Sequence, residues 1–253
     1  MNTTEFYEKN GYAIIEKAIS EDLIDLYEKK WLEENGDNFQ GWDGHTSYLD
    51  HPEILDILCH KNVNDFFMDA QKGVALHLNL TYWVSTEKGW HMDATIPNKL
   101  GSDNYTGAWV ALENISPDSG PFQLIPGSHL WDIDLNEMIP LLEDGKACQE
   151  FLEKQIKKNN GEIVTFNAKK GDILFWHGRL IHRGSTPKNR NVTRKSLIGH
   201  YCNMYANELT QGSHDLSDTL EKLNQMTDVY ARWNDGAYYF SNPDKLKCPP
   251  KKK

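Results

Sequence analysis

Apolar residues along the chain follow two different periods. In segment 20–35 they recur every three or four positions after Ser20, a residue type that caps helix N-termini. Segment 51–72 also suits one helix or a pair of helices, and Pro52 fits a helix start. Beyond residue 73, apolar residues alternate with polar ones or form short runs between Gly and Pro, as in β-strands. The pattern therefore predicts N-terminal helices over about 1–72, a β-rich core over about 73–205 and a C-terminal helix over about 214–236.

The segment 74–84, VALHLNLTYWV, predicts a strand with two unlike faces. Leucines and a tyrosine occupy one set of alternate positions, and mainly polar side chains occupy the other. Because the polar face carries no acidic or basic chain other than His77, we expect it to line a wet pocket; a face turned to solvent is the alternative. His77 itself is more typical of a hydrogen-bonded interior histidine than of a metal ligand. The polar set is His77, Asn79, Thr81 and Trp83.

Short strands separated by turns make up most of the remaining core. Many short strands flanked by helices predict a mainly β fold with flanking α-helices and a double-stranded β-helix core of the jelly-roll, cupin-like type. No change of composition marks a boundary, so we expect a single domain over 1–253. Strands are expected at 105–114, 162–166, 173–182 and 191–205, and a largely helical or irregular insertion is expected at 134–159.

Composition and charge disfavour several classes of function. With 37 acidic against 27 basic residues, the formal net charge is −10, which disfavours binding that depends on neutralising nucleic-acid phosphates. No apolar run approaches the roughly 20 residues that span a bilayer, and the N-terminus lacks the features of a signal peptide. The four cysteines form no CxxC motif, which favours reduced thiols. We therefore expect a cytoplasmic protein that acts on a small molecule, without nucleic-acid or membrane partners; its oligomeric state is open.

The heptapeptide GWHMDAT places His91 and Asp93 two positions apart. With ten histidines and 37 acidic residues such a pair can arise by chance, and His51-Pro52-Glu53 is a second one. The second pair falls at a predicted helix start, and residues two apart on a helix point to nearly opposite sides. The first pair follows a strand-like region, where residues two apart share a face. The first pair is therefore the better candidate for a metal site.

A third ligand can come from far along the chain, because a jelly roll brings distant strands together. His182, after GDILFWHGRLI, closes another predicted strand. Two histidines and one carboxylate on one face of a metal leave three coordination positions open, which is the arrangement of non-haem Fe(II) oxygenases. Imidazole and carboxylate suit Fe(II), and no thiolate is at hand to favour zinc. His91, Asp93 and His182 are therefore candidates for such a site.

Four segments in order are FYEKNGYAIIEKAISEDLIDLYE (6–28), WHMDA (90–94), GAWVALENISPDSGPFQLIPGSH (107–129) and KKGDILFWHGRLIHRGSTPKNRNVTRKSL (169–197). They resemble the N-terminal segment, the His-x-Asp strand end, the most recognisable stretch and the second-histidine region of one family. That family is the phytanoyl-CoA dioxygenase (PhyH)-like family of Fe(II)/2-oxoglutarate-dependent oxygenases. The resemblance runs through most of the chain.

The resemblance implies that His91, Asp93 and His182 are the iron ligands. It also implies that Arg194 holds the distal carboxylate of 2-oxoglutarate, a task that suits a planar guanidinium because it makes two parallel hydrogen bonds. Ser196 would share the strand face of Arg194, in an Arg-x-Ser pairing that recurs in related oxygenases.

Two further assignments follow from the resemblance. The interval from His182 to Arg194 is slightly longer than is usual in the family, which leaves Arg190 as an alternative clamp; we favour Arg194 because it begins an alternating strand. Trp109 matches a family tryptophan beside the co-substrate, and a core aromatic is its alternative role. On the 74–84 strand, Asn79 and Thr81 are candidates for co-substrate contact, and His77, Tyr82 and Trp83 are candidates for substrate contact.

The resemblance also implies a reaction. Fe(II), 2-oxoglutarate and O2 would hydroxylate an unactivated C–H bond of a small metabolite and release succinate and CO2, with ascorbate as the reductant in vitro. Asp93 favours oxygen insertion, because halogenating relatives have a small residue at that position. Desaturation and cyclisation stay open. The expected substrate is an amino acid, a betaine, a phosphonate or a natural-product intermediate.

Two other functions fit the same residues. A zinc-type metal hydrolase or lyase would use the three ligands and would leave Arg194 without a co-substrate to hold. A non-catalytic jelly-roll binding or sensor protein would keep the site and perform no chemistry. The role of Arg194 separates the first alternative from the oxygenase, and succinate release separates the second.

Overall fold

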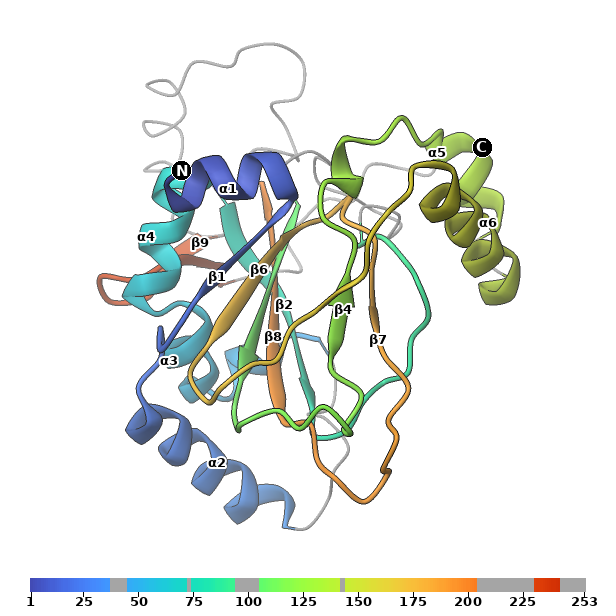
Figure 1. The fold of residues 1–253 in the computed structure, drawn as a ribbon. Helices are drawn as coiled ribbons and strands as arrows, with labels where there is room; N and C mark the ends of the chain where they lie inside the picture. Colours follow the sequence, from blue (N-terminus) through green and yellow to red (C-terminus); the bar gives the residue numbers. More distant parts are fainter. Residues whose placement is uncertain (37–44, 72–73, 94–104, 142–143, 204–229, 242–253) are drawn as a thin grey trace, which may run out of the picture.

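The computed structural model describes residues 1–36, 45–71, 74–93, 105–141, 144–203 and 230–241. Two β-sheets lie face to face, and helices cover the outer side of the larger sheet (Figure 1). The predicted mainly β fold with flanking helices and a jelly-roll core is confirmed.

The first helices begin where the sequence provides cap residues. α1 (Thr3–Asn10) follows Asn2, whose side chain takes part in a capping box. α2 (Glu21–Asn35) follows Ser20, whose hydroxyl accepts a hydrogen bond from the backbone N–H of the third helical residue. The rest of the N-terminal region comprises β1 (Tyr12–Ile15), the 3-10 helix η1 (Ser47–Leu49), α3 (Glu53–Leu58) and α4 (Lys61–Ala70).

The larger sheet carries these helices on one face. Apolar side chains of the helices and of the sheet form one continuous buried cluster, in which Phe66 of α4 stacks on Phe175 with 3.9 Å between ring centroids. All neighbouring strands of this sheet pair antiparallel except the second last pair, which is parallel. The strand order is β1, β6 (Ile173–His177), β3 (Thr106–Ala111), β8 (Ser196–Asn203), β2 (Val74–Tyr82), β10 (Tyr238–Phe240) and β9 (Tyr230–Arg232).

The smaller sheet closes the other side of the interior. Its strands are β5 (Val164–Thr165), β4 (Phe122–Leu124) and β7 (His182–Gly184), with β4 in the centre. Trp109, Trp176 and Ile198 from the larger sheet pack against Phe122 and Leu124 from the smaller one. The expected strand at 173–182 is thus two strands: His182 begins β7 in the smaller sheet and does not close β6, because the chain turns between them.

Strand β2 contains an irregularity that changes which residues face the interior. Its register against β8 shifts between Leu76 and Leu78. Before the shift, Leu76 packs in the cluster under the helices; after it, Leu80 and Tyr82 pack in the cluster between the two sheets. A β-bulge inserts one residue and so exchanges the two faces of a strand. The alternation that predicted a single apolar face therefore spans two faces.

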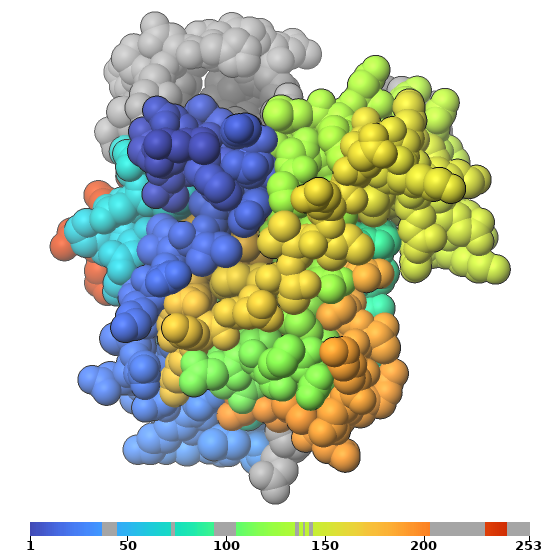
Figure 2. All heavy atoms as spheres, viewed as in Figure 1, coloured from blue at the N-terminus to red at the C-terminus, as the bar shows by residue number. Residues whose placement is uncertain are grey.

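A helical insertion connects β4 to β5, as the sequence predicts. It contains α5 (Leu135–Met138) and α6 (Gly145–Lys158), and α6 begins after Asp144, whose carboxylate accepts hydrogen bonds from two backbone N–H groups. Cys148 and Leu152 of α6 are buried in a third cluster together with Trp90. In the space-filling view the insertion projects from the body at the upper right (Figure 2).

The expected C-terminal helix lies largely in residues outside the described ranges. Where the two overlap the expectation is wrong, because Tyr230–Arg232 forms β9, which pairs antiparallel with β10. Pairing along the edge of β10 supplies the backbone hydrogen bonds that a helix would otherwise provide.

The structure bears on two expectations from the sequence, the absence of a membrane span and the state of the cysteines. Within the described ranges, no helix combines the length and the apolar character that crossing a bilayer requires. Cys59, Cys148 and Cys202 are buried free thiols, and Cys248 lies outside the described residues.

Candidate metal centre

Three side chains from two distant parts of the chain converge inside the fold. His91 and His182 form a β-bridge, and each backbone N–H donates to the other's carbonyl at 3.0 Å. Nε2 of His91 lies 3.8 Å from Oδ1 of Asp93, and Nε2 of His182 lies 3.5 Å from Oδ2. One potential ligand atom from each residue lies within 4.8 Å of the others, which is close enough for one metal ion to bind all three.

Backbone carbonyls orient both imidazoles. Nδ1 of His91 lies 2.7 Å from the carbonyl oxygen of Gly89, and Nδ1 of His182 lies 2.9 Å from that of Leu180. A carbonyl only accepts, so Nδ1 carries the proton in each ring and Nε2 keeps its lone pair. Burial lowers the pKa of both histidines, which favours the neutral form that binds metal.

Asp93 is held in its charged form although it is buried. Burial on its own would raise the pKa of Asp93, but the neighbouring His182, His200 and His91 outweigh it and keep the pKa below its ordinary value. The indole N–H of Trp176 also donates to Oδ2 of Asp93 at 2.8 Å. The carboxylate is therefore available as a metal ligand at neutral pH.

Trp176 is a functional candidate that the sequence reasoning did not single out. It lies on β6, and its indole fits beside β3 only because Gly107 has no side chain: a Cβ there would lie 2.1 Å from the ring. The buried N–H of a tryptophan needs an acceptor, which is a signal that could have directed attention to it. Trp176 fixes Oδ2 of Asp93, while Oδ1 faces Nε2 of His91.

Replacement of Trp176 by Phe is expected to weaken metal binding about 10- to 100-fold, because it removes a hydrogen bond that orients a ligand. Anaerobic calorimetric titration with Fe(II), or with Mn(II) as a stable substitute, measures the change. Trp233→Phe is the matched control, since that indole donates to Asp56 at 3.0 Å. Equal affinities in the two variants would contradict a role for Trp176 at the metal centre.

The three ligand candidates line a cavity of about 120 Å³ that also contains Arg194. Arg194 is 2% exposed, and Nη1 of its guanidinium donates to the carbonyl oxygen of Gly120 at 3.3 Å. Burial lowers the pKa of Arg194 to about 10, against a smaller opposite effect of Tyr82, so the group is charged at neutral pH. Among the described residues no carboxylate pairs with it, and its Nε is buried without a hydrogen-bond partner. A buried cation of this kind calls for an anion in the cavity.

Two more buried nitrogen atoms at the cavity lack a hydrogen bond. Nε1 of Trp109 and Nδ1 of His200 have no hydrogen-bond partner within the part of the chain that the structure describes, although Nδ1 of His200 lies 3.8 Å from Oδ2 of Asp93, and both residues line the cavity. The centre of the Trp109 ring lies 5.9 Å from Cζ of Arg194. Buried polar groups are nearly always satisfied, so these atoms fit a cavity that holds a polar, acidic molecule.

The alternative clamp, Arg190, lies elsewhere. Its side chain is 68% exposed and forms a two-point ion pair with Glu87, in which Nη2 lies 2.9 Å from Oε2. Arg190 does not line the cavity, whereas Arg194 does. The placement agrees with the choice of Arg194, and its binding of 2-oxoglutarate stays a prediction.

The polar face of β2 does not line the cavity, contrary to expectation. The side-chain amide of Asn79 hydrogen-bonds with Ser47 at 2.8 Å, and the hydroxyl of Thr81 lies 2.9 Å from that of Tyr27. Because the register shift in β2 exchanges its faces, these residues are turned toward the N-terminal helices. Their polar groups serve to join the helix layer to the sheet.

Two predicted substrate residues are also occupied elsewhere. Trp83 stacks on Trp31 of α2 at 5.4 Å between ring centroids, and Nε2 of His77 lies 3.1 Å from the hydroxyl of Tyr105. Neither lines the cavity of the metal centre. The placement of Trp83 and His77 does not support the expectation that they contact substrate at the metal centre. The contact with Tyr105 agrees with the alternative that His77 is a hydrogen-bonded interior histidine.

The remaining predictions divide. Tyr82 and Trp109 line the cavity, as expected of residues beside substrate and co-substrate. Ser196 does not line it: its hydroxyl donates to the carbonyl oxygen of Tyr82 at 3.3 Å. We expected Arg194 and Ser196 to share one face of a strand. Ser196 begins β8, whereas Arg194 lies before the strand, and the Ser196 hydroxyl does not reach the cavity.

The comparison with protein families decides the identity of the scaffold. The model of the family described as "Phytanoyl-CoA dioxygenase (PhyH)" matches residues 56–196, more than half of the chain. The chain belongs to the phytanoyl-CoA dioxygenase family. The family segment spans α3 to the start of β8 and includes the three ligand candidates and Arg194.

Curated members of the phytanoyl-CoA dioxygenase family match only over part of their length. A phytanoyl-CoA dioxygenase domain-containing protein 1 homolog of Caenorhabditis elegans is 26% identical over 108 residues, which cover 42% of this chain and 36% of the relative. The peroxisomal phytanoyl-CoA dioxygenase of Homo sapiens is 32% identical over 100 residues, covering 40% and 29%. The matches thus span about a third of these relatives.

Solved structures share the fold over nearly the whole chain. SnoN, a non-haem α-ketoglutarate-dependent epimerase from nogalamycin biosynthesis, has a TM-score of 0.59 at 15% identity and covers 95% of this chain and 97% of its own. EctD from S. alaskensis with 2-oxoglutarate and 5-hydroxyectoine has a TM-score of 0.59 at 18% identity, covering 81% and 76%. At these identities the likeness concerns the fold.

The phytanoyl-CoA dioxygenase scaffold of this chain also has a lysine at the cavity. Lys88 is exposed, lines the cavity and contributes to the electrostatic field at Asp93. Its ammonium group forms no ion pair with the described residues. The sequence offers no signal that separates Lys88 from the other lysines, because its position near the ligands depends on the path of the chain after β2.

The second His-x-Glu pair is closer in space than helix geometry suggested. Nδ1 of His51 lies 3.8 Å from Oε1 of Glu53 and 3.3 Å from Oε2 of Glu34. The expectation was wrong because His51 precedes α3, which Pro52 caps, so the two residues do not share a helix. The three groups form a partly exposed cluster, of a kind common on protein surfaces without a metal.

Proposed function

We propose that the protein is a non-haem Fe(II)- and 2-oxoglutarate-dependent dioxygenase that hydroxylates an unactivated C–H bond of a small metabolite. The observation that carries the proposal is the buried guanidinium of Arg194, which has no carboxylate partner among the described residues and shares a cavity with His91, Asp93 and His182. Membership of the phytanoyl-CoA dioxygenase family supports the same activity.

The donor set fits Fe(II). His91 and His182 would bind the metal through Nε2, since a carbonyl holds each Nδ1, and Asp93 would bind through a carboxylate oxygen. Arg194 would hold the distal carboxylate of 2-oxoglutarate by charge-assisted hydrogen bonds. When bound, iron and 2-oxoglutarate with O2 supply the oxidising power that replaces C–H by C–OH, with succinate and CO2 as products.

The chain contributes orientation and exclusion of water. Phe122 stacks on the imidazole of His182, with 5.2 Å between ring centroids and 5° between ring planes. The stacking and the carbonyl of Leu180 together fix the ring of this ligand candidate. Leu80 and Ile198 line the cavity with apolar surface, which limits the access of water to the reacting groups.

Lys88 at the cavity indicates the charge of the substrate. A second cation on the cavity, besides the one assigned to 2-oxoglutarate, favours a substrate with an anionic group. Amino acids, betaines and phosphonates carry such a group, and a natural-product intermediate can carry one. Proteins of similar fold have been solved with small molecules bound, nogalamycin RO in SnoN and 5-hydroxyectoine in EctD. We propose a cytoplasmic location, which would suit the unpaired thiols of Cys59, Cys148 and Cys202.

The experiment that tests the proposed function is a metabolite screen. Full-length protein with Fe(II), 2-oxoglutarate, ascorbate and O2 is expected to form succinate faster with the substrate than without it. Anaerobic samples are the control, and mass spectrometry should find one oxygen atom added to the substrate. Substrate turnover with Zn(II) and without O2 would favour a hydrolase or lyase. Binding of a metabolite without succinate above the metal-only background would favour the sensor.

A further inference from the structure

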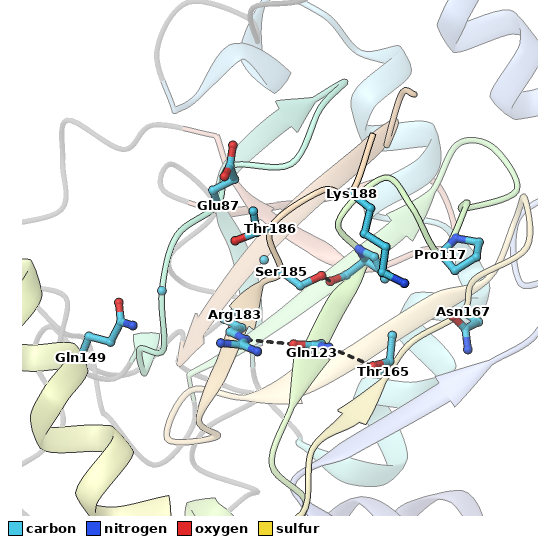
Figure 3. Close-up of a pocket in the computed structure, with 13 residues that line it drawn as sticks. Glu87, Pro117, Gln123, Gln149, Thr165, Asn167, Arg183, Ser185, Thr186 and Lys188 are labelled. Atoms are coloured by element: carbon cyan, nitrogen blue, oxygen red, sulfur yellow. Dashed lines mark hydrogen bonds between the residues drawn. The ribbon is translucent and has the colours of Figure 1, made fainter. Parts of the chain in front are cut away.

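The outer face of the smaller sheet carries a second pocket, of about 620 Å³ (Figure 3). Strand alternation produces it. Along β4 and β7, Phe122 and His182 point into the interior, whereas Gln123 and Arg183 point outward. Among the described lining residues, the two pockets share only Gly184. The outer pocket therefore lies on the other side of the sheet from the metal centre, and β4, β7 and segment 86–89 border both.

Arg183 is held in place across the floor of this pocket. Its Nε donates to Oε1 of Gln123 at 2.8 Å, and Nε2 of Gln123 donates to the hydroxyl of Thr165 at 3.1 Å (Figure 3). On its other side the guanidinium lies over the ring of Trp90, with Cζ 4.2 Å from the centroid. The side chain is thus fixed by a hydrogen-bonded row and an aromatic face.

The two terminal nitrogens of Arg183 have no hydrogen-bond acceptor among the described residues. Within the described residues, Arg183 forms no ion pair with a carboxylate, and its two terminal nitrogens make no hydrogen bond to protein. A guanidinium that is oriented, half-buried and unpaired is prepared for two parallel hydrogen bonds to a carboxylate or phosphate. An arginine with a purely structural role would be expected to use these donors.

The other charges around the pocket favour an anion as well. Lys188 extends along its rim and lies 3.9 Å from Asp118, at the outer limit of an ion pair (Figure 3). Among the described lining residues Glu87 is the acidic one, and Arg190 neutralises it; Glu153, outside this lining, acts electrostatically on Arg183 without forming an ion pair with it. The pocket therefore presents positive charge on a chain whose formal net charge is −10.

The rest of the lining suits hydroxyl groups. Amides and hydroxyls from separate segments line the pocket, and the amide of Asn167 is exposed to it. Such groups both donate and accept, which matches the hydroxyls of a polyol. The polar residues of this set are Gln149, Thr165, Asn167, Ser185 and Thr186.

We propose that this pocket binds a small polyhydroxylated anion, such as a sugar phosphate or a sugar acid, with Arg183 as the anchor of the anionic group. The proposal does not depend on the reaction at the metal centre. Phosphate and carboxylate share the recognition chemistry, so the test includes both.

Calorimetric titration of the full chain tests the proposal with glucose 6-phosphate, glucuronate and uncharged glucose. Saturating 2-oxoglutarate and Mn(II) are present, so that Arg194 is occupied where it binds. We expect saturable binding of at least one anionic probe and no detectable binding of glucose. Arg183→Gln should weaken the binding by roughly tenfold or more, because it removes charge-assisted hydrogen bonds. Lys29→Gln is the charge-matched control, since the side chain of Lys29 is 72% exposed on α2.

A second variant keeps the test valid if Arg183→Gln fails to fold. Asn167→Asp adds a negative charge to the pocket at an exposed position and leaves the Arg183 contacts in place, and it should weaken binding of the anion while the thermal midpoint stays unchanged. The proposal is overturned if neither anionic probe binds, if glucose binds as well as the anions, or if both variants bind like the Lys29 control. A probe that binds only when 2-oxoglutarate is left out occupies the metal centre, and this result would overturn the proposal too.

Discussion

Asp93→Ala is expected to abolish substrate-dependent succinate formation and to weaken metal binding more than about 100-fold. Losing an outer partner of a metal ligand already costs about 10- to 100-fold in affinity, so losing a ligand costs more. Asp93 is also the carboxylate between the two imidazoles, with oxygens 3.8 Å from Nε2 of His91 and 3.5 Å from Nε2 of His182. Without it, two neutral rings remain, and a divalent ion loses its negative ligand.

Two measurements separate this effect from misfolding. Anaerobic titration with Mn(II) reports the affinity, and the thermal midpoint of the metal-free protein reports the fold. Asp118→Ala is the control, because the side chain of Asp118 is 53% exposed and lies outside the metal-centre cavity. A normal metal affinity in Asp93→Ala, with an intact fold, would show that the carboxylate is not a ligand and would remove the basis of the oxygenase proposal.

Local pattern predicts those features that depend on near neighbours in the chain. Ser20 caps α2 because its hydroxyl reaches a backbone N–H three residues on, and that contact is local. His91 and Asp93 share a face because a two-residue step in extended chain returns to the same side. The strand positions of the core and the fold class follow from the same kind of short-range periodicity, together with the family resemblance.

Features that depend on pairing between distant segments are not predictable in this way. The hydrogen bond from Trp176 to Asp93 joins residues that are 83 positions apart in the chain. The bulge in β2 is visible only in the register of this strand against β8. Because of the bulge, Asn79 and Thr81 lie on the face opposite to the one that simple alternation predicts. His182 likewise starts a strand of the smaller sheet because it pairs with β4, a partner that its own sequence does not indicate.

Position alone also does not tell which of two arginines serves the cavity. Arg190 and Arg194 are four residues apart, and both follow the second histidine. The difference between them is a matter of burial and partners: Arg190 is paired with Glu87 at the surface, whereas Arg194 is buried beside Trp109 without an acidic partner among the described residues. We therefore expect replacement of Arg194 to affect the use of 2-oxoglutarate and replacement of Arg190 to leave it unchanged.

Arg194→Ala is expected to raise the KM for 2-oxoglutarate by more than about 30-fold, because removing one partner of a buried, hydrogen-bonded charge pair costs about 2–5 kcal/mol. Arg194→Lys should recover part of the loss, since an ammonium keeps the charge but lacks the planar fork. Metal affinity should stay near that of the unmodified protein, because Arg194 is not a ligand candidate. Succinate formation at varied 2-oxoglutarate concentration gives the KM.

Arg190→Ala is the matched control and should leave the KM for 2-oxoglutarate unchanged, since this arginine is exposed and pairs with Glu87. The thermal midpoint of each variant checks that the loss of a buried side chain has not unfolded the protein. If Arg194→Ala folds, binds metal and turns over a substrate at the unmodified rate, the guanidinium holds no co-substrate, and a zinc-type hydrolase or lyase becomes the better account of the three ligands. If instead the KM rises while metal affinity is kept, the anion that the buried charge of Arg194 requires is 2-oxoglutarate, and the metal centre and the clamp act as two separable parts of one site.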